Sequence, residues 1–205
     1  REENYELIKG DGRLKLIRGD VCDREFVKDL LKDTEIVYHL AAVSGVVQCS
    51  KRPHLALRVN VEGTLNLLEA SDGVEYFIYP SSSAVYGKID GDLAKEDTPP
   101  RPLNNYGAMK ASCEALCMSY YNTYGLGTVV LRFTNIYGVG VYPKWRTVVT
   151  NFILRALRGE PLIIHGTGEQ RRDFIHIDDV IEIYKLVLTP KARGEIFNAG
   201  SGYTT

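Results

Sequence analysis

Tyr106 and Lys110 stand four residues apart in the segment Tyr-Gly-Ala-Met-Lys. On a helix, residues with this spacing share one face, so the phenol and the ammonium would lie side by side. A neighbouring cation stabilises a phenolate, and the pairing is therefore expected to lower the pKa of Tyr106 from about 10 and to make it a usable base. Taken alone, the spacing fits a surface pair better, so the surrounding residues must decide between the two.

A run of hydroxyl-bearing residues precedes this pair. After Pro80, the apolar stretch 76–79 is followed by Ser81-Ser82-Ser83-Ala84-Val85-Tyr86-Gly87. By itself, a serine-rich turn is more often a loop whose side chains bond to their own backbone. If 76–79 is a parallel strand, however, the serines lie at its carboxyl end, where ligands bind in such sheets. Tyr106 follows Ser82 by 24 residues.

Short apolar segments alternate with longer segments of helical spacing. This alternation predicts an α/β fold with a doubly wound parallel sheet of the Rossmann type, its strands buried on both faces. The predicted strands are Leu14–Ile17, Ile36–Ala42, Tyr76–Tyr79, Val129–Phe133, Leu162–Ile164, Phe174–Ile177 and Ile196–Asn198. The predicted helices contain Phe26 to Leu31, Leu57 to Leu68 and Ala111 to Tyr124. Asp23 and Asp178 are expected to cap helices, Pro53 to open one and Gly125 to end one.

The chain is expected to hold one core and part of a second lobe. A dinucleotide-binding core is predicted at 1–137, with 173–198 returning to it, and parts of a smaller substrate-binding lobe at 138–172 and 199–205. The first strand and its glycine-rich turn are lacking, because Gly10-x-Gly12 neither follows an apolar strand nor opens a helix. We expect a longer parent with about 30 or more additional residues before this segment and a further tail after it. Loss of the central first strand would separate two halves of the sheet.

Composition argues against several kinds of partner. The formal net charge is −1, and adjacent basic residues occur only at Lys51-Arg52 and Arg171-Arg172, so no nucleic-acid stripe is visible. No apolar run approaches the roughly 20 residues of a membrane helix, and the polar start does not resemble a signal peptide. A cytoplasmic location is therefore expected. Four cysteines without Cys-x-x-Cys spacing predict inert thiols, and no metal site is expected.

The order of these motifs resembles the extended short-chain dehydrogenase/reductase family, which includes NAD-dependent nucleotide-sugar epimerases and dehydratases. Ser82, Tyr106 and Lys110 are similar to the Ser-Tyr-Lys triad of the family. Ser-Ala-Val-Tyr-Gly resembles its sugar-nucleotide branch, to which UDP-glucose/UDP-galactose 4-epimerases belong. Further matching segments are Gly19–Val21, His39–Ala42, Val59–Thr64, Leu131–Gly138 and Arg172–Asp179.

The resemblance implies a role for each matching residue. Tyr106 would take a proton from a sugar hydroxyl that Ser82 also binds, while Lys110 holds the phenolate and the ribose of the cofactor NAD. The residues implied at NAD are Asp20, Val21, Leu40, Ala41, Ala42, Asn60, Ser81, Tyr106, Lys110 and Phe133. Those implied at the nucleotide-sugar are Ser82, Ser83, Asn135, Val148, His165 and Arg172, with Asn135 and Arg172 at its diphosphate. Structural positions are expected for His39, His176, Asp178 and Asp179.

Epimerisation at C4 of a UDP-hexose, through transient oxidation to a keto-sugar, is the favoured activity. The 4,6-dehydratases of the family carry an Asp-Glu pair where this chain has Ser83 and Ala84, which leaves no carboxylate for the loss of water. Val148-Val149 stand where the best-known UDP-galactose 4-epimerases have Asn-Leu, so the hexose stays open. A dehydratase or reductase of the same family and a non-catalytic NAD-binding scaffold are the alternatives. Family members commonly form homodimers, and a homodimer is expected here.

Overall fold

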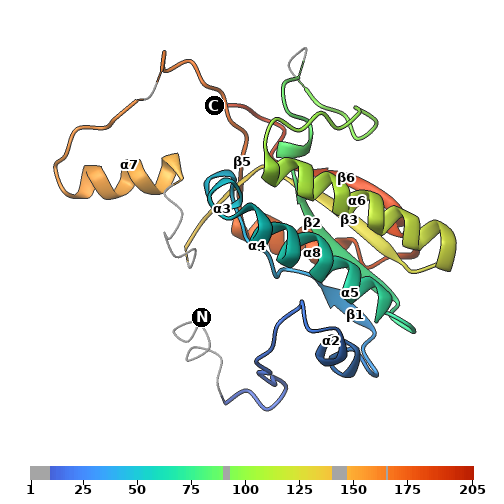
Figure 1. The fold of residues 1–205 in the computed structure, drawn as a ribbon. Helices are drawn as coiled ribbons and strands as arrows, with labels where there is room; N and C mark the ends of the chain where they lie inside the picture. The colour runs from blue at the N-terminus through green and yellow to red at the C-terminus, as the bar shows by residue number, and fades with distance from the viewer. Residues whose placement is uncertain (1–9, 90–92, 140–146, 165) are drawn as a thin grey trace.

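A computed structural model describes residues 10–89, 93–139, 147–164 and 166–205. Four parallel strands form the main sheet in the order β1-β2-β3-β6 (Figure 1). They are β1 (Ile36–Tyr38), β2 (Tyr76–Ser82), β3 (Thr128–Phe133) and β6 (Glu195–Ala199). Two further parallel strands, β4 (Asn135–Tyr137) and β5 (Phe174–His176), form a separate small sheet. The predicted parallel α/β architecture is confirmed.

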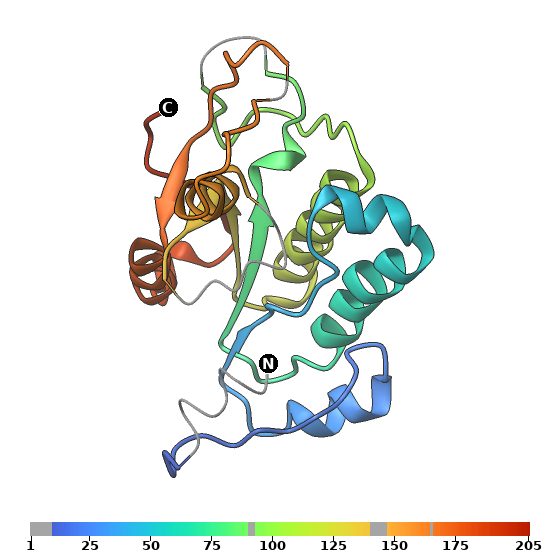
Figure 2. The same ribbon diagram turned by 90° about the vertical axis from the view of Figure 1, so that its left-hand side faces the viewer.

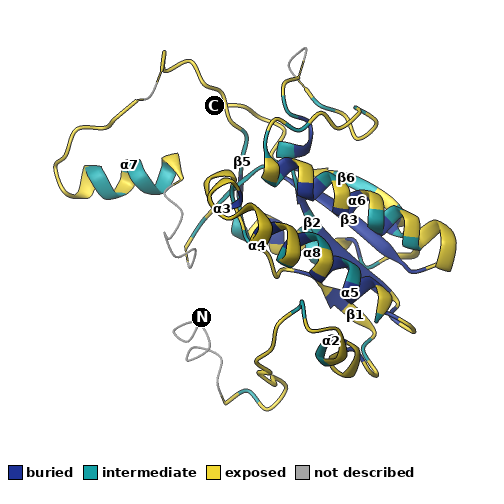
Figure 3. Cartoon of the chain, in the orientation of Figure 1, coloured by how far each residue is buried: buried dark blue, intermediate teal, exposed yellow. Residues whose placement is uncertain are grey.

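Helices cover both faces of the main sheet (Figures 1 and 2). On one face, α2 (Arg24–Leu30), α5 (Gly63–Glu69) and α6 (Asn105–Tyr124) pack against Phe77 and Tyr79 of β2. On the other face, α8 (Ile177–Leu186) packs against Tyr76 and Ile78. Successive strand residues point to opposite faces, so a strand buried on both sides is apolar over most of its length. Figure 3 shows this burial along the middle strands.

The remaining elements connect these layers. The chain runs from β1 through α3 (Val46–Lys51), α4 (Pro53–Leu57) and a π-helical turn (Arg58–Glu62) into α5. Short 3₁₀ turns occupy Ser83–Val85 and Pro190–Ala192. α7 (Val148–Leu157) stands apart from the main sheet (Figure 1). Within the described ranges, no helix combines the length and apolar composition that a membrane crossing requires.

Two predicted strands are wrong, and two extend too far. Leu14–Ile17 and Leu162–Ile164 are irregular, β1 ends at Tyr38 rather than at Ala42, and β5 ends at His176 rather than at Ile177. A β-strand needs a hydrogen-bonded neighbour, and in the described part of the chain neither segment has one; Leu14, Leu16 and Ile17 are accordingly about half exposed. The four strands of the main sheet form one continuous hydrogen-bonded sheet. The Leu14–Ile17 segment does not join it.

Three of the four predicted helix boundaries are confirmed. The Asp23 carboxylate accepts a hydrogen bond from Phe26 N at 3.1 Å, Pro53 opens α4, and Gly125 ends α6 in the left-handed conformation. The cap assigned to Asp178 is wrong. His176 caps α8 instead, because its Nδ1 accepts from the Asp178 backbone nitrogen at 3.3 Å.

Candidate active site

The start of α6 lies directly against the turn that follows β2. Asn104 caps the helix, its side-chain oxygen accepting from Gly107 N at 2.9 Å. Gly107 is buried, and a Cβ atom there would come within 2.5 Å of the Ala84 carbonyl oxygen. The absent side chain thus permits a close approach that brings Tyr106 next to the residues at the end of β2.

Ser82, Tyr106 and Lys110 lie together at the carboxyl end of β2. Ser82 is the last residue of the strand. Its hydroxyl lies close to Tyr106, and hydrogen bonding from this hydroxyl acts to lower the pKa of the Tyr106 phenol. Lys110 Nζ lies 6.0 Å from the centroid of the Tyr106 ring and 4.6 Å from that of Tyr79. It donates a hydrogen bond to the Pro80 carbonyl at 2.5 Å. The predicted proximity is observed, while the catalytic roles stay predictions.

The electrostatics of this cluster differ from the expectation for Tyr106. Burial raises the pKa of Tyr106, an effect that the Ser82 hydroxyl opposes and Cys49 reinforces, so the expected lowering is wrong for this chain. Lys110 is also buried, and burial lowers its pKa to about 8. Desolvation favours the neutral form of each group. The spacing of the pair did not reveal this, because it carries no information on how deeply the two side chains are buried.

A buried polar network behind the cluster was missed by the sequence analysis. Arg132 Nη2 and Glu114 Oε2 form an ion pair at 2.8 Å, and the Ser81 hydroxyl donates to Glu114. Arg132 Nη1 donates to the Tyr86 hydroxyl at 2.7 Å, which in turn donates to Asn198 Oδ1 at 2.6 Å. Ser81, predicted to contact NAD, thus points its hydroxyl into the protein. An arginine in an otherwise apolar strand was the available signal, because a buried charge requires a partner.

Asn60 fixes the loop after β1, where three of the predicted NAD residues lie. Its side-chain oxygen accepts from Val43 N at 2.7 Å, and its amide nitrogen donates to Val43 O at 3.0 Å. Asn60 is buried, whereas residues 40–42, which precede Val43, are exposed at the carboxyl edge of the sheet. The loop therefore presents the exposed residues Leu40, Ala41 and Ala42 at the carboxyl edge of the sheet.

Asp20 and Val21, also predicted at NAD, lie in the segment before α2. Asp20 Oδ1 accepts from Cys22 N at 2.9 Å, and this bond lowers the pKa of the exposed Asp20 carboxyl. Asn66 donates to Val21 O at 3.0 Å, which ties the segment to α5. Phe133, also predicted at the cofactor, is buried at the end of β3 in register with Ser82.

His39 is a core histidine that is satisfied at one ring nitrogen. Nε2 lies 2.8 Å from the Thr64 hydroxyl, while Nδ1 is buried and has no hydrogen-bond partner among the described residues. Burial, with a smaller contribution from Lys110, lowers the pKa of His39 to about 4. The ring is therefore neutral near pH 7, in keeping with a structural position.

The predicted substrate residues occupy several places. Val148 and Arg172 line one cavity of 560 Å³, together with Phe152, Phe174 and Thr205. Asn135 begins β4, and both its backbone and its amide nitrogen donate to the carbonyl of Asp173, the residue after Arg172. Ser83 lies in the turn after β2, whereas His165 falls outside the described residues.

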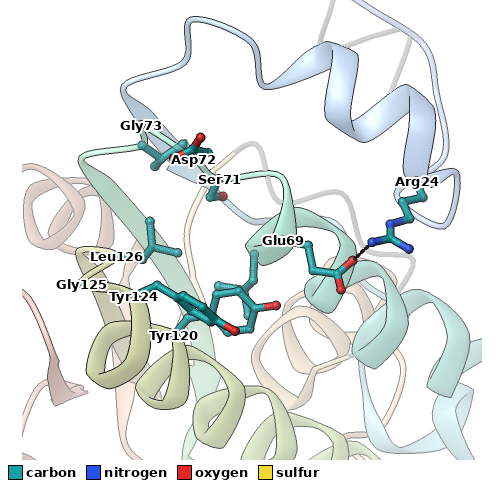
Figure 4. A pocket seen from close by; sticks show the side chains of 11 residues that line it. Arg24, Glu69, Ser71, Asp72, Gly73, Tyr120, Tyr124, Gly125 and Leu126 are labelled. Carbon is teal, nitrogen blue, oxygen red and sulfur yellow. Dashed lines mark ion pairs between the residues drawn. The ribbon is translucent and has the colours of Figure 1, made fainter.

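The structure has two further hollows, one near the site and one distant from it. A cavity of 550 Å³ lies between the loop after β1 and the small sheet, with Ser44, Tyr137 and His176 in its lining. The other hollow, of 530 Å³, lies among α2, α5 and the end of α6, and Arg24 pairs there with Glu69 at 3.0 Å. Figure 4 shows the residues that line it. It lies at the opposite end of α6 from Tyr106, roughly 21–27 Å away by helix length, and none of the predicted site residues lines it.

The residues at the carboxyl edge fit NAD. An ammonium has three donors, and within the described residues Lys110 Nζ makes one hydrogen bond, to Pro80. The remaining donors can bind ribose hydroxyls, and the exposed 40–42 backbone lies at the same edge. In the described ranges, no group of three or more His, Cys, Asp or Glu side chains is placed to hold a metal ion.

Comparison with known proteins identifies the family. The family model described as "NAD dependent epimerase/dehydratase family" matches residues 1–200. The chain belongs to the NAD-dependent epimerase/dehydratase family. A mouse protein named dTDP-D-glucose 4,6-dehydratase is 37% identical over 205 residues, which is 98% of this chain and 57% of the mouse protein.

Solved structures with similar folds represent both activities of this family. DesIV, a dTDP-glucose 4,6-dehydratase of Streptomyces venezuelae solved with NAD, is 30% identical with a TM-score of 0.92 over 100% of this chain and 64% of its own. A UDP-glucuronic acid 4-epimerase of Bacillus cereus, solved with UDP-glucuronic acid and NAD, is 34% identical with a TM-score of 0.89 over 99% of this chain and 65% of its own. The chain thus spans less than two thirds of the length of these relatives.

Proposed function

We propose that the protein containing this chain is an NAD-dependent nucleotide-sugar epimerase that acts at C4 of a UDP-hexose. The observation that carries the proposal is the convergence of Ser82, Tyr106 and Lys110 at the carboxyl end of β2, with Lys110 Nζ 6.0 Å from the Tyr106 ring. A hydroxyl, a phenol and an ammonium in one place supply the donor, the base and the charge that oxidation of a carbinol requires.

Each residue has a distinct task in this reaction. Tyr106 removes the proton from the sugar hydroxyl, and Ser82 binds the same oxygen and orients it. Lys110 stabilises the phenolate by its charge and binds the cofactor ribose. When bound, NAD would supply the hydride acceptor for oxidation of the sugar carbon and the hydride donor for its reduction from the opposite face. The raised pKa of Tyr106 makes this charge from Lys110 necessary, because a buried phenol otherwise keeps its proton.

The turn after β2 favours epimerisation over dehydration. Ser83 and Ala84 occupy the positions where the 4,6-dehydratases that this chain resembles carry an acidic pair, so this chain offers no carboxylate there to assist loss of water. The mouse relative and DesIV are nevertheless named as dehydratases, which makes dehydration the second candidate. A reductase and a non-catalytic NAD-binding scaffold are further alternatives.

The cavity beside Arg172 suits the nucleotide of the substrate. Its lining combines the Arg172 guanidinium with apolar side chains from α7 and β5, which fits a diphosphate joined to a flat base. In this proposal residues 1–137 and 173–198 form the core that holds NAD. Residues 138–172 and 199–205 belong to the lobe that holds the nucleotide.

Product analysis tests the proposal. The protein is incubated with NAD and with UDP-glucose or dTDP-glucose, and the products are identified by nuclear magnetic resonance. An epimerase yields the hexose inverted at C4 without net formation of reduced cofactor. A 4-keto-6-deoxy sugar would instead establish the dehydratase, and a net gain in absorbance of the reduced nicotinamide would establish an oxidoreductase. Binding of NAD without turnover of any nucleotide-sugar would favour the scaffold.

The assembly and location of the protein complete the proposal. We infer a cytoplasmic homodimer that pairs through α5 and α6, the helices that cover one face of the sheet. Analytical ultracentrifugation of the protein with NAD measures its mass directly. A monomer at micromolar concentration would exclude the dimer without affecting the chemistry assigned to the triad.

A further inference from the structure

Asp173 ties the end of the described chain to the start of β5. Its Oδ1 accepts hydrogen bonds from the backbone nitrogen of Ser201 at 2.9 Å and from the Ser201 hydroxyl at 2.8 Å. Its Oδ2 accepts from Gly202 N at 3.1 Å, and the Thr134 hydroxyl donates to Oδ1 at 3.3 Å. One carboxylate therefore holds the 200–202 turn against the small sheet.

Gly200 independently shows how tightly this turn is packed. A Cβ atom at position 200 would lie 2.5 Å from Asp173 Oδ2 and 2.7 Å from Thr134 Cγ2. Real side chains do not approach that closely, so a side chain at position 200 would displace the turn, the Asp173 carboxylate or the Thr134 methyl group. The contact between the turn and the carboxylate is therefore closely packed.

The strap 200–205 forms part of the wall of the 560 Å³ cavity. Asp173 forms an isolated antiparallel bridge with Thr204, and the backbones of Arg172 and Thr205 exchange two hydrogen bonds of 2.9 Å. Arg172 and Thr205 both line the cavity. The strap is therefore held at two places, at Thr205 by the Arg172 backbone and at Ser201 and Gly202 by the Asp173 carboxylate.

Asp173 also fixes Asn135, the second residue predicted at the diphosphate. The main-chain carbonyl oxygen of Asp173 accepts a hydrogen bond from the Asn135 backbone nitrogen at 3.2 Å and another from the Asn135 side-chain amide nitrogen at 3.0 Å. The Asp173 carboxylate would repel a nearby diphosphate if it were free. Its four hydrogen-bond donors compensate the negative charge and direct it toward the strap.

We propose that Asp173 is a positioning residue for the nucleotide of the substrate. It fixes the strap 200–205, Asn135 and Arg172 as one unit, so that the cavity is formed before the nucleotide binds. Asp173 itself does not touch the ligand. The inference rests on the proposed function in one respect, the assignment of a nucleoside diphosphate to this cavity.

Calorimetric titration with UDP and with dTDP, in the presence of NAD, tests the inference on the protein that contains this chain. We expect Asp173→Ala to weaken binding of the nucleotide by about tenfold or more, because several charge-assisted hydrogen bonds are lost. Asp173→Asn should bind with intermediate affinity, since an amide oxygen can still accept from Ser201 while its nitrogen cannot accept from Gly202. In the same variants KM should rise while kcat stays within about threefold.

Two further variants make the result specific. Gly200→Ala disturbs the same contact from the other side and should weaken nucleotide binding in the same direction, even if Asp173→Ala fails to fold. Asp179→Asn removes an exposed carboxylate from the first turn of α8 and should leave nucleotide affinity unchanged.

The outcomes separate this inference from the proposed function. Nucleotide affinity equal to wild type in Asp173→Ala or Asp173→Asn would overturn the positioning role alone. A parallel loss of thermal stability, NAD affinity and kcat would overturn it in favour of a general structural role. Failure of the wild-type protein to bind either nucleotide would overturn both, and this is seen before any variant is compared.

Discussion

Arg132 Nη2 and Glu114 Oε2 form an ion pair at 2.8 Å. The side chain of Arg132 is only 3% exposed, and that of Glu114 only 4%. Glu114 lies on α6 one turn after Lys110, and Arg132 lies on β3. The pair, extended by Ser81 and Tyr86, therefore joins the helix that carries Tyr106 and Lys110 to the strand end that carries Ser82.

Removal of one partner of this pair should destabilise the protein strongly. In Arg132→Met, Glu114 would be left buried without its counter-charge, at a cost of about 3–5 kcal/mol. Denaturant unfolding of the protein measures the loss. The matched control is the exposed pair of Glu182 and Lys185, where Glu182→Gln should change stability by less than about 0.5 kcal/mol. Similar losses of unfolding free energy in the two variants would contradict the large cost assigned to leaving Glu114 buried without Arg132.

The buried His39 should make stability depend on pH. The folded-state pKa of His39 is about 4, below its ordinary value, so the unfolded chain binds more protons than the folded chain between about pH 4 and 6.5. Stability is then fully present above about pH 6.5 and falls as the pH drops toward 4, by on the order of 3 kcal/mol. Unfolding curves at several pH values should show a shallower slope for His39→Gln. Identical slopes would mean that His39 is not buried as a neutral ring.

The close approach at Gly107 gives a third prediction. In Gly107→Ala the new methyl group meets the Ala84 carbonyl, so the start of α6 must shift away from the turn after Ser82. We expect a loss of about 1–3 kcal/mol and a fall in kcat, because Tyr106 moves with the helix. Ala108→Ser, at the exposed neighbouring position, is the control and should change neither quantity appreciably. Wild-type kcat and stability in Gly107→Ala would contradict the packing described here.

Lys110 should titrate well below ordinary lysines. Burial lowers its pKa to about 8, compared with about 10.4 for an exposed lysine. The Cε resonances of labelled lysines, followed by nuclear magnetic resonance against pH, should include one with a midpoint about two pH units below the rest. Its absence from the Lys110→Gln spectrum assigns it. If every lysine titrates near 10, the ammonium is not desolvated.

The sheet could be predicted because the relevant signals are local, since apolar runs mark β2 and β3. The four-residue spacing of Tyr106 and Lys110 places both on one helix face, whereas their grouping with Ser82 was predicted only from the family resemblance. Other features depend on partners distant in sequence. Ser81 and Glu114 are 33 residues apart, and no spacing rule connects them. The apolar run Leu14–Ile17 has the composition of a strand, yet without a hydrogen-bonded neighbour it stays irregular.

Single-turnover and steady-state kinetics of Tyr106→Phe test the proposed mechanism most directly. The substitution removes only the ionisable oxygen, so kcat should fall by about 10²–10⁴-fold while the affinity for UDP-hexose stays within about threefold. Tyr124→Phe, at an exposed position on the same helix, should retain full activity. Wild-type turnover by Tyr106→Phe would contradict the assignment of this phenol as the base.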